Sequence, residues 1–106
     1  MHEEGFWDVA RLRIVARNCG YSSGKFASQL GVCPRHLRRQ IRLRFGVSMG
    51  DWIKEQRLLA AADELRVIRV VKLVAFAFGF PSVSQFSREF RHWFCITPSA
   101  FLKGGF

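Results

Sequence analysis

Residues 33–45 read CPRHLRRQIRLRF, a stretch that predicts a helix with one basic and one apolar face. At about 100° per residue, four arginines recur at i, i+3, i+4 and i+7 on one side, namely Arg35, Arg38, Arg39 and Arg42. Leu37, Ile41 and Phe45 follow a separate side, which predicts their burial. No acidic residue is interleaved to form the ion pairs typical of a solvated charged helix. The pattern therefore favours a helix that presents guanidinium groups to a groove lined by phosphates and base edges.

The composition fits one small domain with a polyanionic partner. Of the 106 residues, 49% are hydrophobic, which is enough for a core but not for a large one. The net charge of +9 points to a polyanion, but it does not separate DNA from RNA or from an acidic membrane surface. Three cysteines without CxxC spacing fit reduced thiols, and no apolar run approaches the ~20 residues of a membrane span. We therefore expect a soluble, cytoplasmic protein without a membrane partner.

Capping and breaking signals outside this stretch predict an all-α fold of about seven helices. The predicted helices cover residues 6–18, 23–30, 34–45, 48–66, 71–78, 83–94 and 98–102, and residues 67–70 are interpreted as a connection. Gly31 lies between the second and third helices, where a left-handed residue would end the second one. Two helices joined by a short turn containing Gly form a helix-turn-helix.

The second half of the sequence repeats the first. Ala27, Leu30 and Gly31 match Ala75, Phe78 and Gly79, each 48 positions later, and after the extra residue Pro81 the offset becomes 49. Core positions then pair with core positions and arginines with arginines. We therefore expect one DNA-binding unit (1–106) with a first helix-turn-helix lobe (6–47), a linker helix (48–66) and a second lobe (67–106). Recognition helices ~34 Å apart can enter successive major grooves, so a monomer could read a bipartite site.

Four motifs then resemble the DNA-binding region of the AraC/XylS family of transcription regulators. They are LGV-x-P-x-x-L-x-R at 30–39, RL-x-x-A at 57–61, GF-x-S-x-S-x-F-S-R-x-F at 79–90 and ITPSAF at 96–101. The resemblance implies a seven-helix, two-lobed, homeodomain-like fold whose third and sixth helices enter adjacent major grooves. It also implies promoter regulation, often activation, and makes RNA polymerase a further candidate partner.

The resemblance also assigns DNA-facing residues in both recognition helices. In the first, Arg35, Arg38 and Arg39 would read bases, and Arg42 would lie nearer phosphate. In the second, the residues carried over are Ser84, Gln85 and Arg88, with Ser82 placed for a phosphate. Arg can fork onto guanine and Gln onto adenine, but which side chains reach bases stays open at this point.

Three departures from the family pattern carry expectations of their own. Cys33 stands where a Ser cap is usual, which weakens the start of that helix by about 1 kcal/mol. Cys95 replaces the Gly expected before Ile96, so the end of the sixth helix should be strained or differently closed. The family's usual ligand-binding or dimerisation domain is absent, so we expect no small-molecule inducer within this chain. The two helix-turn-helix units predict a monomer on DNA.

An asymmetry between the repeats predicts a surface for a protein partner. Leu73, Phe76 and Ala77 share a helix face on which the first repeat has Lys25, Ser28 and Gln29. The alternative is that the tail, through Leu102 or Phe106, folds over this face.

The sequence lacks the patterns of a metal site or a catalytic centre. His36 and His92 lie far apart without metal-ligand spacing, and no nucleophile–His pair, paired carboxylates or phosphate-cradling loop occurs, so we expect no metal, no cofactor and no enzyme. The aromatic residues keep helical spacing, which favours a core over base stacking on RNA. The function expected is a sequence-specific regulator of double-stranded DNA, interpreted as an activator at the nucleoid. Two alternatives are a nonspecific architectural nucleoid protein and a DNA-binding fragment whose sensing domain belongs to a partner chain.

Overall fold

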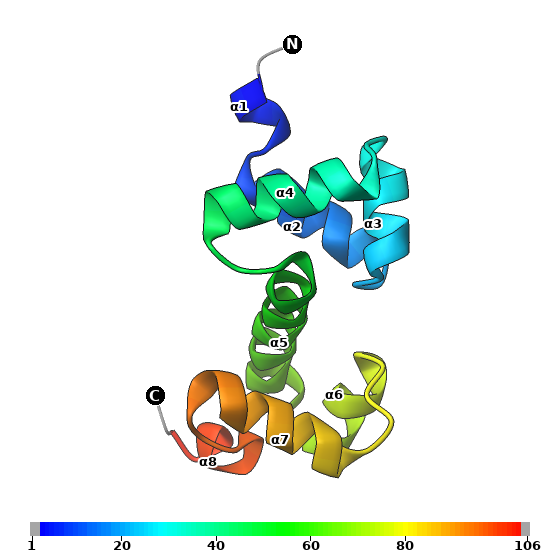
Figure 1. The fold of residues 1–106 in the computed structure, drawn as a ribbon. Helices are drawn as coiled ribbons and strands as arrows, with labels where there is room; N and C mark the ends of the chain where they lie inside the picture. Colours follow the sequence, from blue (N-terminus) through cyan, green and yellow to red (C-terminus); the bar gives the residue numbers. More distant parts are fainter. Residues whose placement is uncertain (1–2, 105–106) are drawn as a thin grey trace. The chain divides into compact units, whose positions relative to one another are not determined.

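The all-α fold is confirmed. The computed structural model describes residues 3–104, and in that range it contains eight helices and no strand (Figure 1). They are α1 (Glu3–Phe6), α2 (Val9–Asn18), α3 (Ser23–Leu30), α4 (Pro34–Phe45), α5 (Met49–Ile68), α6 (Val71–Ala77), α7 (Val83–Phe94) and α8 (Pro98–Leu102). Seven of them correspond to the predicted helices, and α1 is an additional single turn. The chain divides between Gln56 and Arg57 into two compact units, each with its own hydrophobic core.

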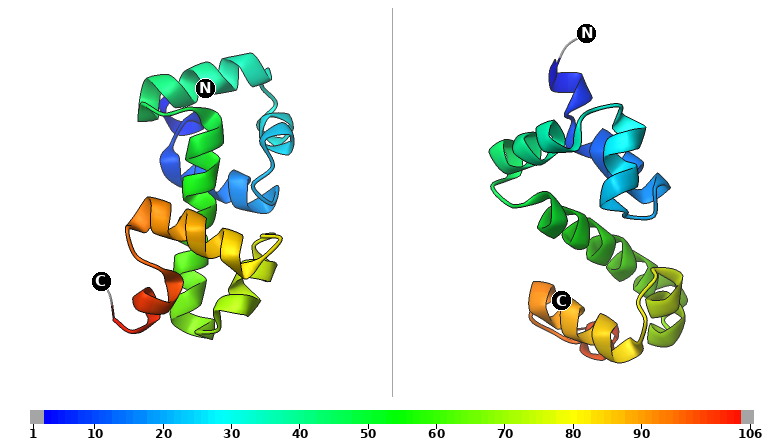
Figure 2. Two further views of the ribbon diagram at one scale, coloured as in Figure 1. Left: turned by 60° about the horizontal axis from the view of Figure 1, so that its bottom comes forward. Right: turned by 45° about the vertical axis from the view of Figure 1, so that its right-hand side comes forward.

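The first unit packs α2, α3, α4 and the first turns of α5 around one core. Figure 2 shows α3 and α4 meeting at their connecting turn, as in a helix-turn-helix. Trp52 of α5 joins these helices, since its ring stacks on Phe26 at 5.7 Å and on Phe45 at 5.5 Å between centroids. Phe45 is partly buried, and the members with 0% exposure are Leu12, Ala16, Phe26, Leu37 and Ile41. Leu37 and Ile41 of α4 thus lie in the core as predicted.

The start of this unit differs from the prediction. The prediction of a helix over residues 6–18 is wrong at its beginning. The chain leaves helical geometry at Trp7 and Asp8, and α2 starts at Val9. Trp7 is only 5% exposed and packs edge-on against Phe6, with 4.8 Å between ring centroids. Burial of this large ring explains the break, since tertiary packing overrides a weak local preference for helix.

The second unit packs the rest of α5 with α6, α7 and α8. Phe90 of α7 lies at the centre of its core, with its ring 5.7 Å from Phe86, 4.6 Å from Phe94 and 5.5 Å from Phe101. The helix α5 reaches Ile68, so the first half of the connection predicted for residues 67–70 is helical instead. Arg69, with φ of 60°, then redirects the chain into α6.

The helix ends follow the capping signals closely. Ser22, Ser82 and Thr97 each accept a hydrogen bond from the backbone N–H three residues later. Cys33, the counterpart of Ser82 in the first unit, makes no such bond. Cys95 has φ of 66°, the left-handed conformation that its counterpart Gly46 adopts at 73°. A side chain in this conformation is strained, as predicted from the sequence.

Candidate nucleic-acid interface

The helix α4 presents its four predicted arginines to solvent. Arg35, Arg38, Arg39 and Arg42 are all exposed, whereas Leu37 and Ile41 between them are fully buried. The helix therefore rests on the first core by one side and carries a row of guanidinium groups on another. Pro34 begins the helix and Gly46 ends it, so both ends of this row are fixed by local backbone preferences.

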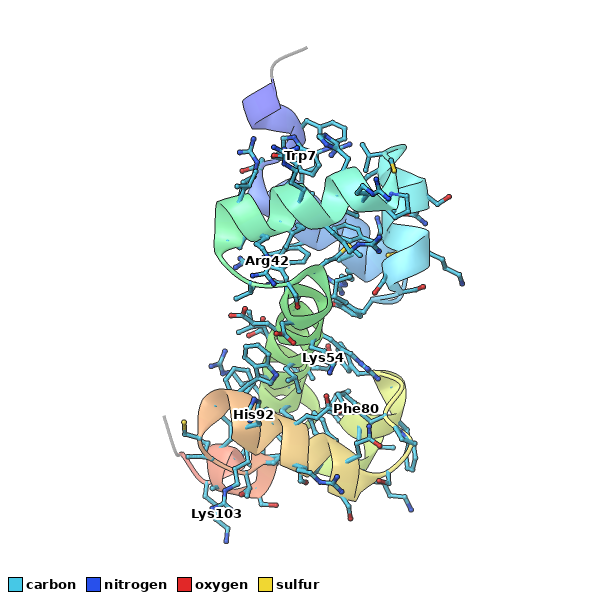
Figure 3. All side chains as sticks on the ribbon, viewed as in Figure 1. Trp7, Arg42, Lys54, Phe80, His92 and Lys103 are labelled. Carbon is cyan, nitrogen blue, oxygen red and sulfur yellow. The ribbon has the colours of Figure 1, made fainter. Side chains whose placement is uncertain are left out.

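Trp7 supports α4 on a side that the row of four arginines, Arg35, Arg38, Arg39 and Arg42, does not occupy. Its ring lies 5.7 Å from the His36 ring at 70° and also 5.7 Å from the guanidinium carbon of Arg44. Arg44 Nε also donates to Gln40 Oε1 at 3.2 Å, so His36, Gln40 and Arg44 share one face at i, i+4 and i+8. Figure 3 shows Trp7 and Arg42 on different sides of α4. Trp7 is therefore a positioning residue for the arginine row.

This role of Trp7 was missed at the level of sequence. The local signal was Asp8, which occupies the N-cap position of α2 although its side chain makes no capping hydrogen bond. An N-cap residue at position 8 would have placed Trp7 outside the helix.

The helix α7 repeats the arrangement with less charge. Phe86 and Phe90 are fully buried, while Ser84, Gln85 and Arg88 are exposed. The amide of Gln85 donates from Nε2 to Glu89 Oε2 at 3.4 Å, which holds the side chain along the helix surface. An adenine contact would require this long hydrogen bond to be exchanged for bonds to the base.

Ser82 lies at the start of α7. Its Oγ accepts the backbone N–H of Gln85 at 3.1 Å, and a hydroxyl that accepts in this way still has its own hydrogen to donate. Together with the N–H groups that the first helical turn leaves without an intrahelical acceptor, that hydrogen suits a phosphate oxygen.

Arg57 of α5 fastens the turn between α6 and α7. Its Nε donates to the carbonyl oxygen of Phe78 at 2.7 Å, and its guanidinium carbon lies 3.9 Å from the centroid of the Phe80 ring. Gly79 between them has φ of 79°, and a Cβ on this residue would come within 3.2 Å of Arg57 Nη2. The motif at residues 57–61 contains this arginine, but no sequence signal identifies its partner 21 residues later.

The two helix-turn-helix units together account for the family match. Residues 26–104 match the helix-turn-helix domain family. The chain belongs to the AraC/XylS family of transcription regulators. As a member of the AraC/XylS family, it is a sequence-specific DNA-binding transcription regulator and not an enzyme.

Curated AraC/XylS relatives match over most of the chain. The probable transcription factor PqrA of Proteus vulgaris is 32% identical over 92 residues, which cover 86% of this chain and 75% of PqrA. The regulatory protein SoxS of Escherichia coli K12 is 37% identical over 87 residues, covering 81% of this chain and 71% of SoxS. The transcriptional regulator RipA of Corynebacterium glutamicum is 36% identical over 80 residues, which are 24% of its length.

A solved structure shares the fold. The crystal structure of a DNA-binding transcriptional dual regulator from Escherichia coli K-12 matches with a TM-score of 0.76 and 26% identity, over 89% of this chain and 87% of that one.

Among the described residues, no helix has both the length and the apolar character needed to cross a bilayer.

Proposed function

We propose that the protein binds promoter DNA as a monomer, with α4 and α7 in two successive major grooves. The observation that carries the proposal is the common register of the two helices. Arg39 and Arg42 of α4 correspond to Arg88 and Arg91 of α7 after an offset of 49, and all four side chains are exposed above separate cores. Two such helices in one chain supply both half-site readers without dimerisation.

The four arginines of α4 have two kinds of role in this proposal. Arg35, Arg38 and Arg39 lie in the first half of the helix, the part that reaches base edges in helix-turn-helix complexes, and each can fork onto O6 and N7 of guanine. Arg42 lies a turn later and contacts phosphate. In α7, Gln85 and Arg88 read bases, Ser84 contributes a hydroxyl and Ser82 holds a phosphate.

The two helices contribute unequally. From Pro34 to Phe45 the helix α4 contains five arginines and no acidic residue, whereas α7 has Arg88 and Arg91 beside Glu89. Counterion release makes each phosphate contact salt-dependent. The helix α4 therefore supplies more of the affinity and of the salt dependence, and α7 refines the choice of site.

In this proposal the protein activates transcription by contacting RNA polymerase. It does so in the cytoplasm, at the nucleoid, and binds no inducer within this chain. The solved regulator with the same fold is described as a dual regulator, which denotes action in either direction. Transcription in vitro from a promoter with the selected site, with and without the protein, decides the sign.

Selection of sites from random DNA, followed by fluorescence anisotropy, tests the DNA-binding proposal. We expect a non-palindromic site with two half-sites about one helical turn apart, bound by one chain and preferred over bulk DNA by ~10³-fold or more. Scrambling the α4 half-site should weaken binding more than scrambling the α7 half-site. An architectural protein would instead show a steep salt dependence and little preference, and a need for two chains per site would contradict the monomer.

A further inference from the structure

The exposed side of α6 is almost entirely apolar. The residues of this helix that face solvent are Lys72, Leu73, Phe76 and Ala77, of which Leu73 is 56% and Phe76 53% exposed. Val70, three residues before Leu73, extends the same row and is 45% exposed. We call Val70, Leu73, Phe76 and Ala77 the α6 apolar face. At the equivalent positions, α3 has exposed polar residues. Leu73, Phe76 and Ala77 of α6 correspond to Lys25, Ser28 and Gln29 of α3.

The described part of the tail does not cover this face. Leu102 packs on the second core instead, and its carbonyl oxygen accepts a hydrogen bond from Arg69 Nη2 at 2.9 Å. The other residue considered as a cover, Phe106, lies outside the described residues. The position of Leu102 therefore contradicts the alternative that Leu102 folds over the α6 apolar face. Leu73 and Phe76 stay accessible in the described structure.

The charged residue of α6 is basic. Lys72 lies on the helix itself and is exposed, whereas the guanidinium group of Arg66 lies 5.2 Å from the Phe101 ring of α8 and that of Arg69 donates to the Leu102 carbonyl oxygen. Arg66 is paired with Asp63, but between Glu64 and Glu89 the sequence has no acidic residue. Apolar side chains with a basic border complement a surface in which apolar anchors are bordered by carboxylates.

We propose that the α6 apolar face docks an acidic amphipathic helix of another protein. Such a helix can place Leu or Phe anchors against Leu73 and Phe76 while a Glu or Asp residue meets Lys72. A second copy of this chain would oppose basic residues to basic residues, which costs binding energy. An acidic membrane surface would offer the same sign of charge, and the vesicle measurement below distinguishes it from a protein partner.

This docking goes beyond the proposed function, because it concerns a helix that carries none of the proposed base-reading residues. Affinity for the selected DNA site is measured separately on every variant. Loss of site-specific binding by the unmodified chain would overturn the DNA proposal alone, and absence of peptide binding would overturn the docking proposal alone.

The probe is a synthetic peptide of about 16 residues with Leu and Phe at i, i+3, i+4 and i+7 and Glu along both borders. A matched peptide has Lys at every Glu position. Each is titrated into the full-length ¹⁵N-labelled chain, and amide shifts locate the contact. We expect the Glu peptide to shift the amides of Val71–Ala77 and to bind at least about tenfold more tightly than the Lys peptide. Equal binding of both peptides, or shifts centred on α4, would overturn the proposal.

The decisive variant is Leu73→Lys with Phe76→Ser, which installs the residues of the first unit at equivalent positions. We expect it to bind the Glu peptide at least about tenfold more weakly and DNA with unchanged affinity. Ile14→Ser, which removes another exposed apolar residue from α2, is the matched control and should change neither. Lys72→Glu reverses the charge at an exposed position, so it tests the charge contact even where the double variant loses its fold. We expect it to weaken the Glu peptide severalfold, and unchanged binding would contradict the proposed charge contact.

Two further measurements separate the other occupants. Sedimentation equilibrium should show that the unmodified chain is a monomer. Self-association that disappears in the Leu73→Lys, Phe76→Ser double variant would assign the α6 apolar face to a second copy of the chain. Vesicles of phosphatidylcholine and phosphatidylserine should bind the unmodified chain and the double variant equally. A loss of vesicle binding in the double variant would assign the face to a membrane.

Discussion

Arg57 Nε donates a hydrogen bond to the carbonyl oxygen of Phe78 at 2.7 Å. This bond connects α5 with the turn that precedes α7, and the Phe80 ring on the same turn lies 3.9 Å from the Arg57 guanidinium carbon. One side chain thus fixes the backbone and a core ring of the turn together. The turn leads directly into α7, so in the proposed DNA complex Arg57 positions this helix without contacting DNA itself.

Arg57→Met should keep the aliphatic stem but lose the hydrogen bond to the Phe78 carbonyl and the contact with the Phe80 ring. We expect a loss of about 2 kcal/mol in the free energy of unfolding, from a hydrogen bond of a charged donor and a cation–π contact. Lys54→Met on the exposed side of α5 is the control and should change stability by less than about 0.5 kcal/mol. Urea unfolding followed by circular dichroism measures both, and equal midpoints for the two variants would remove the role given to Arg57.

Arg39→Gln and Arg42→Gln should weaken DNA binding in different ways. Arg39→Gln should remove a pair of hydrogen bonds to a base. The free-energy difference between the preferred and the other bases at that one base pair should fall by about 1–3 kcal/mol. Loss of a phosphate contact at Arg42 should weaken all sequences alike and reduce the salt slope by about one. Anisotropy titrations at several salt concentrations, on the selected site and on single-base variants of it, separate the two effects. The assignment of roles fails if both variants show the same pattern.

Trp7→Ala should destabilise the first unit and weaken DNA binding together. The ring is 5% exposed and packs against Phe6, His36 and Arg44, so its removal should cost about 3 kcal/mol. Trp7→Phe retains an aromatic ring and should lose less than half as much. Thermal unfolding and affinity for the selected site are the measurements. Full affinity in a folded Trp7→Ala protein would contradict the positioning of α4 by this residue.

Cys33→Ser should supply the cap that α4 lacks. A serine Oγ at this position can accept the N–H of His36, as Ser82 Oγ accepts that of Gln85 at 3.1 Å. We expect a gain of about 1 kcal/mol in the free energy of unfolding. The reciprocal change Ser82→Cys should lose about as much, and a thermal melt of both variants compares the two caps. A loss of stability in Cys33→Ser, a gain in Ser82→Cys, or no shift in either variant would contradict the role given to these caps.

Cys95→Gly should relieve the strain at the end of α7. Its φ of 66° lies in the region where an L side chain crowds the following carbonyl, and glycine removes this cost but adds entropy to the unfolded chain. The net gain should be about 0.5–1 kcal/mol. The counterpart Gly46 has φ of 73° and no heavy atom within 4 Å of the place a Cβ would take. Gly46→Ala should therefore lose about 1 kcal/mol from backbone strain alone, and chemical unfolding of the two variants checks the opposite signs.

The sequence predicted the elements whose determinants lie within a few residues of one another. Ser22 and Gly31 bound α3, and Pro34 and Gly46 bound α4, so periodicity and capping sufficed for both helices. The exposed arginine row of α4 followed from the same periodicity once Leu37 and Ile41 were assigned to the core.

The features that escaped prediction depend on partners far along the chain. Trp7 breaks its helix because its ring packs near His36, 29 positions later, and the role of Arg57 requires the Phe78 carbonyl. The helical state of Val67 and Ile68 was missed for another reason. Their β-branched side chains favour strand as a weak preference, whereas the helix of α5 continues cooperatively from the buried Leu65.

The uncapped start of α4 and the left-handed Cys95 also bear on how this sequence can evolve. Each departs from a favourable residue at a cost of about 1 kcal/mol, against a typical total of about 5–15 kcal/mol for a domain. A chain that retains two such residues stands closer to the threshold below which further mutations are lost by selection. Cys33→Ser combined with Cys95→Gly would provide a more tolerant background, in which changes to the DNA-reading arginines can accumulate without loss of folding.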